Sequence, residues 1–245
     1  MNKLFMKFAN LLPNKLQIAT VRFYIDSKIK RHTALHVNGL EKLDCTYKRP
    51  YLFVCNHLSN SDGLVLNKVL AKEKLIFVAG KKLEANSMTN LGFKTVRTIS
   101  ISPNSADKDA VKRIVRAVNE GNNIFMFPEG TRSRTAKMIE AKKGILLIAK
   151  LTNAPIVPIG IWGTEKFMPV QKDMGKEAFY DADININIGD IFTLPKKSAD
   201  ETKRSWEEHS LNDMMMRIAE LVPQEYRGIY EINTADSYQL RKCEG

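Results

Sequence analysis

The chain has 245 residues, of which 44% are hydrophobic and 27% are charged, an ordinary balance for a globular protein. This length allows one large domain with a real core, or one domain with a small appendage. Lys and Arg number 38 against 27 Asp and Glu, which gives a formal net charge of +11. Such a surplus suggests nucleic acid, an anionic membrane or a phosphorylated substrate as partner, although a general need for solubility would produce it too.

Cysteine usage and hydropathy exclude several classes of protein. The three cysteines, Cys45, Cys55 and Cys243, form no CxxC pair, so we expect neither a disulfide framework nor a zinc site, and we infer a reducing, cytosolic location. No uncharged apolar run is long enough for a membrane-spanning helix. The N-terminal apolar stretch is not followed by a small-residue cleavage site, so we do not expect a cleaved signal peptide.

Two apolar segments with basic flanks open the chain, at residues 3–12 and 15–31, and Pro13 separates them. Apolar residues recur at helical spacing in both, which predicts a pair of amphipathic helices. Helices of this kind bind anionic membrane interfaces, but a helix pair packed on the main domain fits the pattern equally well. We place the boundary of this N-terminal unit, residues 1–35, near residue 35.

Apolar runs typical of buried strands alternate with amphipathic stretches in the remainder, residues 36–245. Strands are predicted at 51–55, 75–79, 95–101, 123–127 and 156–161, with a half-exposed strand at 184–188. Helices are predicted at 63–72, 105–119, 138–152 and 203–221. This alternation predicts an α/β fold with a mainly parallel or mixed central sheet and flanking helices, in addition to the N-terminal helix pair.

A polar run at residues 56–62 follows the first buried strand, where catalytic groups of α/β proteins gather. His57 is suited to accept a proton near neutral pH, and Asp62 could fix its tautomer and stabilise the imidazolium. Five helical steps would hold the two side chains apart, so they can meet only if His57 lies on a loop and Asp62 in the first helical turn. The same spacing fits a capping box in which Ser59 is the N-cap and Asp62 only binds backbone N–H groups. Cys55 continues the apolar strand, so we expect it to be packed in the core rather than to act as a nucleophile.

A second polar loop, residues 127–134, follows another buried strand. Pro128 and Gly130 predict a tight turn that a ligand can approach closely, and Arg132 and Arg134 offer planar sets of donors for a phosphate. A solvated basic turn would have the same composition.

Together these two loops resemble two sequence blocks of the glycerolipid acyltransferase family. Asn56-His57-x-x-x-x-Asp62 is similar to its first block, and Phe127-Pro128-Glu129-Gly130-Thr131-Arg132-Ser133, about 70 residues later, to its third. Residues 154–159 are similar to the fourth block, Lys143-Gly144 to the Lys-Gly pair before the intervening helix, and residues 221–230 to a tail of bacterial members. The resemblance covers roughly residues 37–230, and it is closest to bacterial 1-acylglycerol-3-phosphate acyltransferases.

The resemblance implies transfer of a fatty acyl group from acyl-CoA or acyl carrier protein to the free hydroxyl of 1-acylglycerol 3-phosphate, giving phosphatidic acid for phospholipid biosynthesis. It implies that His57 and Asp62 are catalytic, and that Glu129, Gly130, Thr131 and Arg132 hold the acceptor's phosphate end together with Arg97. No metal or organic cofactor is needed for direct transfer. We expect the protein at the cytoplasmic face of the membrane, peripheral or monotopic, with an anionic membrane surface and a lysophospholipid as partners.

The second block of the family is altered here. Its Ile-Asp-Arg-like stretch matches Thr95-Val96-Arg97, in which Val96 replaces the acid, and residues 87–90 replace the usual proline-containing loop. The acceptor could therefore differ, with glycerol 3-phosphate or a lyso-aminolipid as alternatives. A non-catalytic lipid-binding protein of the same fold remains another alternative. The basic residues are scattered and form no stripe interleaved with aromatic residues, so we do not expect a nucleic-acid partner.

Overall fold

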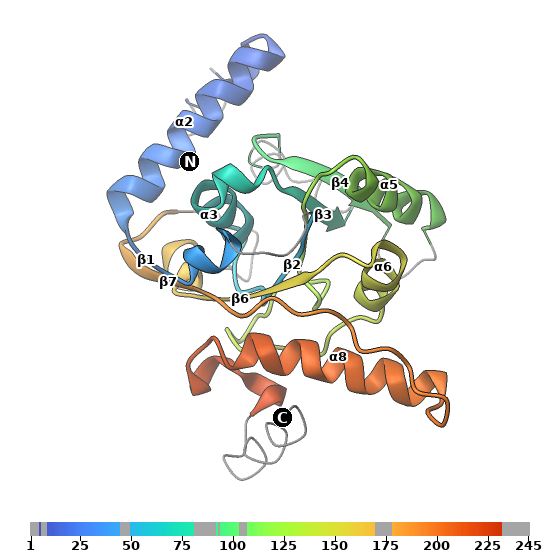
Figure 1. The fold of residues 1–245 in the computed structure, drawn as a ribbon. Helices are drawn as coiled ribbons and strands as arrows, with labels where there is room; N and C mark the ends of the chain where they lie inside the picture. The colour runs from blue at the N-terminus through green and yellow to red at the C-terminus, as the bar shows by residue number, and fades with distance from the viewer. Residues whose placement is uncertain are drawn as a thin grey trace.

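Seven strands form one mixed β-sheet in a computed structural model of the chain, which describes residues 5, 9–44, 50–80, 92, 94–102, 107–169 and 178–231 (Figure 1). Their order across the sheet is β1-β7-β6-β2-β5-β3-β4. The strand bounds are β1 (Thr33–Asn38), β2 (Leu52–Cys55), β3 (Ile76–Gly80), β4 (Arg97–Ile101), β5 (Ile124–Met126), β6 (Ile156–Trp162) and β7 (Ala182–Ile188). All neighbouring strands pair in parallel except β6 and β7, which confirms the predicted α/β class with a mixed sheet.

Helices cover both faces of this sheet. Their bounds are α2 (Asn14–His32), α3 (Asp62–Val69), α5 (Lys108–Asn119), α6 (Gly144–Thr152), α7 (Thr164–Phe167) and α8 (Lys203–Ala219), with short 3-10 turns η1 (Leu40–Asp44), η2 (Ala71–Glu73), η4 (Gln224–Tyr226) and η5 (Gly228–Tyr230). Buried side chains of α5, α6 and α8 pack in one hydrophobic cluster, whereas those of α2, α3 and α7 pack in the other.

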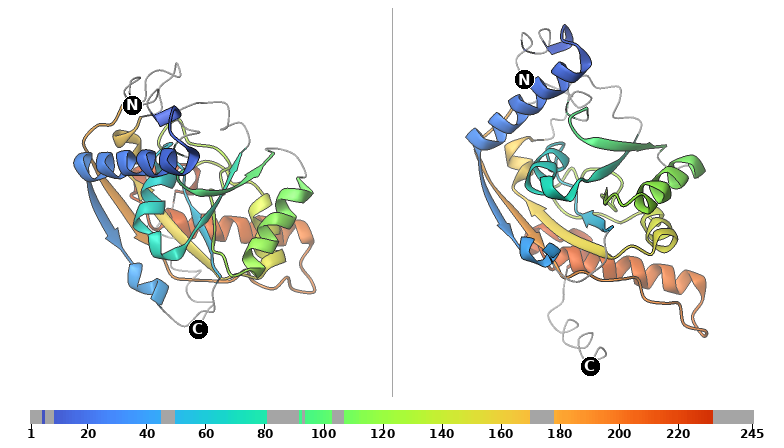
Figure 2. Two further views of the ribbon diagram at one scale, coloured as in Figure 1. Left: turned by 90° about the horizontal axis from the view of Figure 1, so that it is seen from above. Right: turned by 45° about the horizontal axis from the view of Figure 1, so that its top comes forward.

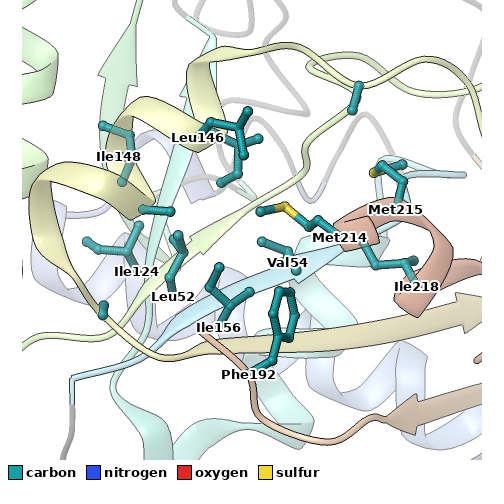
Figure 3. Close-up of a cluster of buried hydrophobic side chains, with 14 of the residues drawn as sticks. Leu52, Val54, Ile124, Leu146, Ile148, Ile156, Phe192, Met214, Met215 and Ile218 are labelled. Carbon is teal, nitrogen blue, oxygen red and sulfur yellow. The ribbon is translucent and has the colours of Figure 1, made fainter. Parts of the chain in front are cut away.

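The alternation of side chains along β2 divides it between these two clusters. Leu52 and Val54 belong to the cluster under α6 and α8, where they lie near Ile156 and Met214 (Figure 3). Phe53 and Cys55 point to the opposite face, and all four β2 side chains are buried. A strand covered on both faces must be apolar at every position, which explains the uninterrupted apolar run in the sequence.

The predicted helix at 138–152 is wrong in its first turn and a half, because α6 begins only at Gly144. Backbone N–H groups of the preceding residues bind the loop after β5 instead of forming helical bonds. The N–H of Ile139 donates to Glu129 Oε2 at 3.2 Å, and that of Lys142 donates to the Pro128 carbonyl at 2.8 Å. Tertiary hydrogen bonds have thus replaced the local ones that the apolar periodicity predicted.

The N-terminal unit joins the sheet directly, because β1 spans the boundary that we placed at residue 35. The helix α2 buries a stripe at Val21, Ile25 and Ile29 on the side of the sheet that carries α3, and it runs along the margin of the domain in Figures 1 and 2. Most of the predicted first helix, residues 3–12, lies outside the described residues. Among the helices that the structure describes, none has both the length and the apolarity to cross a bilayer.

Candidate active site

The two polar loops of the sequence meet at one edge of the sheet. The strands β2 and β5 are parallel neighbours, with Leu52 paired to Ile124 and Val54 to Met126. The loops that follow them therefore leave the sheet side by side, at the carboxyl ends of the strands, where α/β proteins bind their ligands. The backbone bond from the Ser133 N–H to the His57 carbonyl, 2.8 Å, joins the two loops directly.

The imidazole of His57 and the carboxylate of Asp62 form a hydrogen-bonded pair. His57 Nδ1 lies 2.7 Å from Asp62 Oδ2. Asp62 is completely buried, whereas 18% of the His57 side chain remains exposed. As required by the spacing, His57 lies on the loop and Asp62 is the first residue of α3, so five residues of sequence bring the pair together. In this geometry Nδ1 carries the proton and donates a hydrogen bond to the Asp62 carboxylate. Nε2 is then unprotonated and can act as a base.

Asp62 also binds the backbone, so this residue makes both of the predicted kinds of contact, one with the His57 ring and one with backbone N–H groups. Its Oδ2 accepts the N–H of Leu58 at 2.7 Å and that of Ser59 at 2.9 Å, in addition to the imidazole. Ser59 itself is not the N-cap, because α3 is preceded by Ser61 and the Ser59 hydroxyl donates to the Met168 carbonyl at 2.8 Å. The capping-box prediction was thus correct for the carboxylate and wrong for the serine.

Nε2 of His57 faces no hydrogen-bonding partner among the residues that the structure describes. A base that is oriented on one nitrogen and unoccupied on the other can accept a proton from an incoming hydroxyl. In the same loop, Asn56 is fully buried and exchanges two hydrogen bonds with the backbone of Ile161 in β6, at 2.8 and 2.9 Å. These bonds anchor the start of the loop to the neighbouring strand.

Phe127 and Glu129 contact His57 directly, which the sequence did not reveal. The Phe127 ring is stacked on the imidazole, with 3.9 Å between ring centroids and 13° between planes. Glu129 Oε1 accepts the backbone N–H of His57 at 3.1 Å. Both residues belong to the block that resembles the acyltransferase family. The resemblance implied no contact for Phe127, and for Glu129 it implied substrate binding.

The carboxyl group of Glu129 is fully buried, and its two oxygens accept the backbone N–H groups of His57 and Ile139. Burial raises the pKa of Glu129 to about 8, and this outweighs the two backbone hydrogen bonds, which lower it. The expected role of Glu129 as a direct phosphate contact therefore does not fit its position, because both of its oxygens are engaged with backbone N–H groups.

Three residues of this loop, Gly130, Thr131 and Arg134, are exposed to solvent. Gly130 adopts φ +69°, and both it and Thr131 are exposed. Arg132 is half-buried and Arg134 is exposed. The stem of Lys142 passes close to Gly130, since a Cβ at that glycine would lie 3.3 Å from Lys142 Cγ. Backbone, hydroxyl and cationic groups thus lie on or next to a loop that is hydrogen-bonded to the loop of His57, and such groups suit a phosphate.

Arg97 is not part of this group. It is the first residue of β4, and its guanidinium donates to Asn122 Oδ1 at 2.8 Å. The strand register aligns Arg97 with Leu52, which precedes His57 by five residues. At about 3.3 Å per residue and about 4.8 Å per strand, Arg97 lies on the order of 20 Å from His57, at the opposite edge of the sheet.

Among the described residues, the carboxyl end of β4 presents no cation in place of this arginine. Ile101 ends the strand and Ser102 follows it, with its N–H bound to Asp107 Oδ2 at 2.9 Å. Arg97 lies at the start of β4, so matching it to the arginine of the altered block put that arginine at the end of the strand remote from His57. Residues 87–90 lie outside the described residues, as do Lys81 and Lys82.

Cys55 is buried beneath the site. Burial raises the pKa of its thiol well above the ordinary value, and the carboxylates of Asp62 and Glu129 raise it further. The structure thus agrees with a packing role for Cys55 and leaves His57 as the reactive group of this loop.

Comparisons with known proteins agree with this fold. The model of the Acyltransferase family matches residues 32–162, which include both loops, and the chain belongs to this family. A 1-acyl-sn-glycerol-3-phosphate acyltransferase of Brassica napus chloroplasts is 34% identical over 66% of the chain, and one of Bacillus subtilis is 24% identical over 60%. These alignments span 44% and 72% of the respective relatives, so the chain matches less than half the length of the plant enzyme.

The fold is also that of a solved structure. The crystal structure of the 1-acyl-sn-glycerophosphate acyltransferase PlsC from Thermotoga maritima superposes with a TM-score of 0.60 at 22% identity. The match covers 89% of this chain and 87% of that one. The fold is therefore shared well beyond the residues of the two loops.

Proposed function

We propose that the protein transfers a fatty acyl group from a thioester, acyl-CoA or acyl carrier protein, to the free hydroxyl of 1-acylglycerol 3-phosphate, giving phosphatidic acid. The observation that carries this proposal is the His57–Asp62 pair, which lies on a loop hydrogen-bonded to the loop that carries Arg132 and Arg134. The names of the relatives support the choice of acceptor, because plant and bacterial members carry the same one.

The transfer needs one base and no covalent enzyme intermediate. Nε2 of His57 takes the proton of the acceptor hydroxyl while the hydroxyl oxygen attacks the thioester carbonyl carbon. The buried carboxylate of Asp62 stabilises the imidazolium that forms. When the tetrahedral intermediate collapses, the C–S bond breaks and the imidazolium returns its proton to the leaving thiolate. No metal or organic cofactor takes part in these steps.

The phosphate of the acceptor is held by the loop after β5. Gly130 and Thr131 present backbone and hydroxyl donors, and Arg132 presents a guanidinium that matches phosphate geometry. Lys142 supplies a second cation next to Gly130. Arg97 has no part in this site because of its position at the far edge of the sheet.

The experiment is an assay of purified protein with palmitoyl-CoA and a panel of acceptors, namely 1-acylglycerol 3-phosphate, glycerol 3-phosphate and lyso-aminolipids, followed by mass spectrometry. We expect phosphatidic acid as the main product and no product from His57→Ala. His209→Ala is the matched control, because His209 is exposed on α8 and pairs with Glu201. Full turnover by His57→Ala would refute the proposed base, and acylation of another acceptor alone would refute the proposed substrate.

We further propose that α2 and the turn before it bind an anionic membrane surface, at the cytoplasmic face, where the lipid substrate resides. Leu11 is 84% exposed and Phe23 is 77% exposed, and α2 carries five Lys and Arg residues against one acidic residue. Exposed apolar side chains among cations favour insertion at an anionic interface.

Vesicle flotation tests the membrane proposal. Phe23→Asp should reduce binding to vesicles that contain phosphatidylglycerol while leaving the acylation of a short-chain, soluble acceptor unchanged. Ile229→Asp is the matched control, because Ile229 is 65% exposed in η5 and distant from α2 in sequence. Equal loss of binding in both variants would show that α2 has no special part in membrane association.

A further inference from the structure

Phe127 covers one face of the His57 imidazole. It is the first residue after β5, and its ring lies 3.9 Å from the imidazole centroid at an angle of 13°, so the two rings are nearly parallel. Phe127 also packs against Phe125 of the core, with 5.2 Å between centroids. The ring that contacts the base is therefore itself supported by the buried interior.

The same loop holds the backbone of His57 on both sides. The His57 N–H donates to Glu129 Oε1 at 3.1 Å, and the His57 carbonyl accepts the Ser133 N–H at 2.8 Å. Glu129 Oε2 in turn accepts the N–H of Ile139 at 3.2 Å, which fixes the loop to the segment before α6. Residues 127–133 thus contact His57 in three places, once at its ring through Phe127 and twice at its backbone through Glu129 and Ser133.

A single hydrogen bond does not fix the orientation of an imidazole. The torsion χ2 of histidine is broad, so the bond from Nδ1 to Asp62 leaves the ring free to tilt. A flat ring stacked on one face restricts that tilt, and it thereby fixes the direction in which Nε2 points. An aromatic face also attracts a cation, so the stacked ring favours the imidazolium over the neutral imidazole.

We propose that Phe127 is a positioning residue for His57, and that Glu129 and the Ser133 N–H hold the loop so that the Phe127 ring stays in place. This deepens the proposed function and rests on it, since it assigns His57 as the base. It also gives the buried carboxyl of Glu129 a role that does not require contact with substrate.

Replacement of Phe127 separates its aromatic face from its volume. Phe127→Leu keeps an apolar side chain but removes the ring, and it should lower kcat by about 10- to 100-fold, as misplacement of a reacting group does, with KM for both substrates little changed. Phe127→Tyr keeps the ring and should restore most of kcat. Phe192→Leu is the matched control, because Phe192 lies in the cluster on the opposite face of the sheet and should lose stability but not turnover (Figure 3).

The outcomes of this series are decisive in both directions. A loss in kcat for leucine that tyrosine restores supports the proposal. Equal losses for leucine and tyrosine, or a change in KM alone, would overturn it. Should Phe127→Leu fail to fold by circular dichroism, Phe127→Met provides the same comparison with a flexible side chain.

A measurement without turnover distinguishes failure of this inference from failure of the proposed function. In NMR spectra of histidine-labelled protein, the signals of the carbon-bound ring protons of His57 should be displaced upfield by the Phe127 ring current. Comparison with His57→Gln identifies these signals. Phe127→Leu should abolish the displacement, whereas Phe192→Leu should not. If no acyl transfer is found but the displacement is present, the stacking holds and only the reaction is wrong. If wild-type protein shows no displacement, the positioning role of Phe127 is wrong whatever the activity.

Discussion

Asp62→Asn is the most informative single substitution, because Asp62 serves both the base and the backbone. Three N–H groups converge on Asp62 Oδ2, from the His57 ring at 2.7 Å, Leu58 at 2.7 Å and Ser59 at 2.9 Å. The amide oxygen of asparagine can accept all three, so the loop should keep its shape. The amide NH₂ then takes the place of Oδ1, which is buried and already without a partner, so one unsatisfied group replaces another.

The two roles of Asp62 differ in their dependence on charge. Loss of stability should be about 1 kcal/mol, since the amide oxygen keeps the three hydrogen bonds and loses only their charge assistance, and this corresponds to a Tm shift of about 2–4 °C. In the transition state the imidazolium loses its attraction to a carboxylate. At about 4 Å and an effective dielectric constant of about 20, this attraction is on the order of 4 kcal/mol, or about 10³-fold in kcat.

The assay compares kcat on 1-acylglycerol 3-phosphate with Tm from circular dichroism. Asp107→Asn is the matched control, because the Asp107 carboxylate accepts the backbone N–H groups of Ala110 and Ser102, each at 2.9 Å, at the start of α5. It should shift Tm by a similar amount and leave kcat unchanged. If Asp62→Asn keeps wild-type turnover, Asp62 acts only as a cap, and the catalytic pair is refuted.

Three further predictions follow from the surroundings of the site. Cys55→Ala should keep most activity because the buried thiol stays protonated, and an acyl group found on Cys55 by peptide mass spectrometry would revive it as the nucleophile. The pKa of Glu129 is raised to about 8 in the folded state, so the protein binds a proton on folding and its free energy of unfolding should fall as pH rises from about 4.5 to 8. Glu129→Gln should flatten this fall when stability is measured by urea unfolding at each pH. Parallel curves of stability against pH for the two proteins would contradict the prediction. Arg132→Lys should lower kcat/KM for the phosphorylated acceptor by about tenfold to more than a hundredfold, because lysine cannot donate in bidentate fashion. Equal loss on an acceptor without phosphate would show that Arg132 supports the loop rather than binding the phosphate.

The sequence by itself determined the fold class of this protein and the pairing of His57 with Asp62. Strands buried on both faces have no polar positions, so runs such as 51–55 and 156–161 are visible without any long-range information. His57 and Asp62 are five residues apart, so the local chain geometry alone restricts how they can meet, and the loop-then-helix arrangement inferred from that spacing is the one observed. Their resemblance to a known family then indicated the chemistry.

Tertiary structure decided what depends on contacts between distant parts of the chain. Arg97 and Glu129 were both expected at the phosphate, but the register of the sheet places one at the far edge and burial turns the other toward the backbone of His57. The stacking of Phe127 on His57 joins residues 70 positions apart, and it arises because β2 and β5 are neighbours. Residue type and spacing do not encode which strand ends become adjacent or which side chains lose contact with water. These are properties of the packed sheet, because parallel pairing is set by contacts between segments that are remote in sequence.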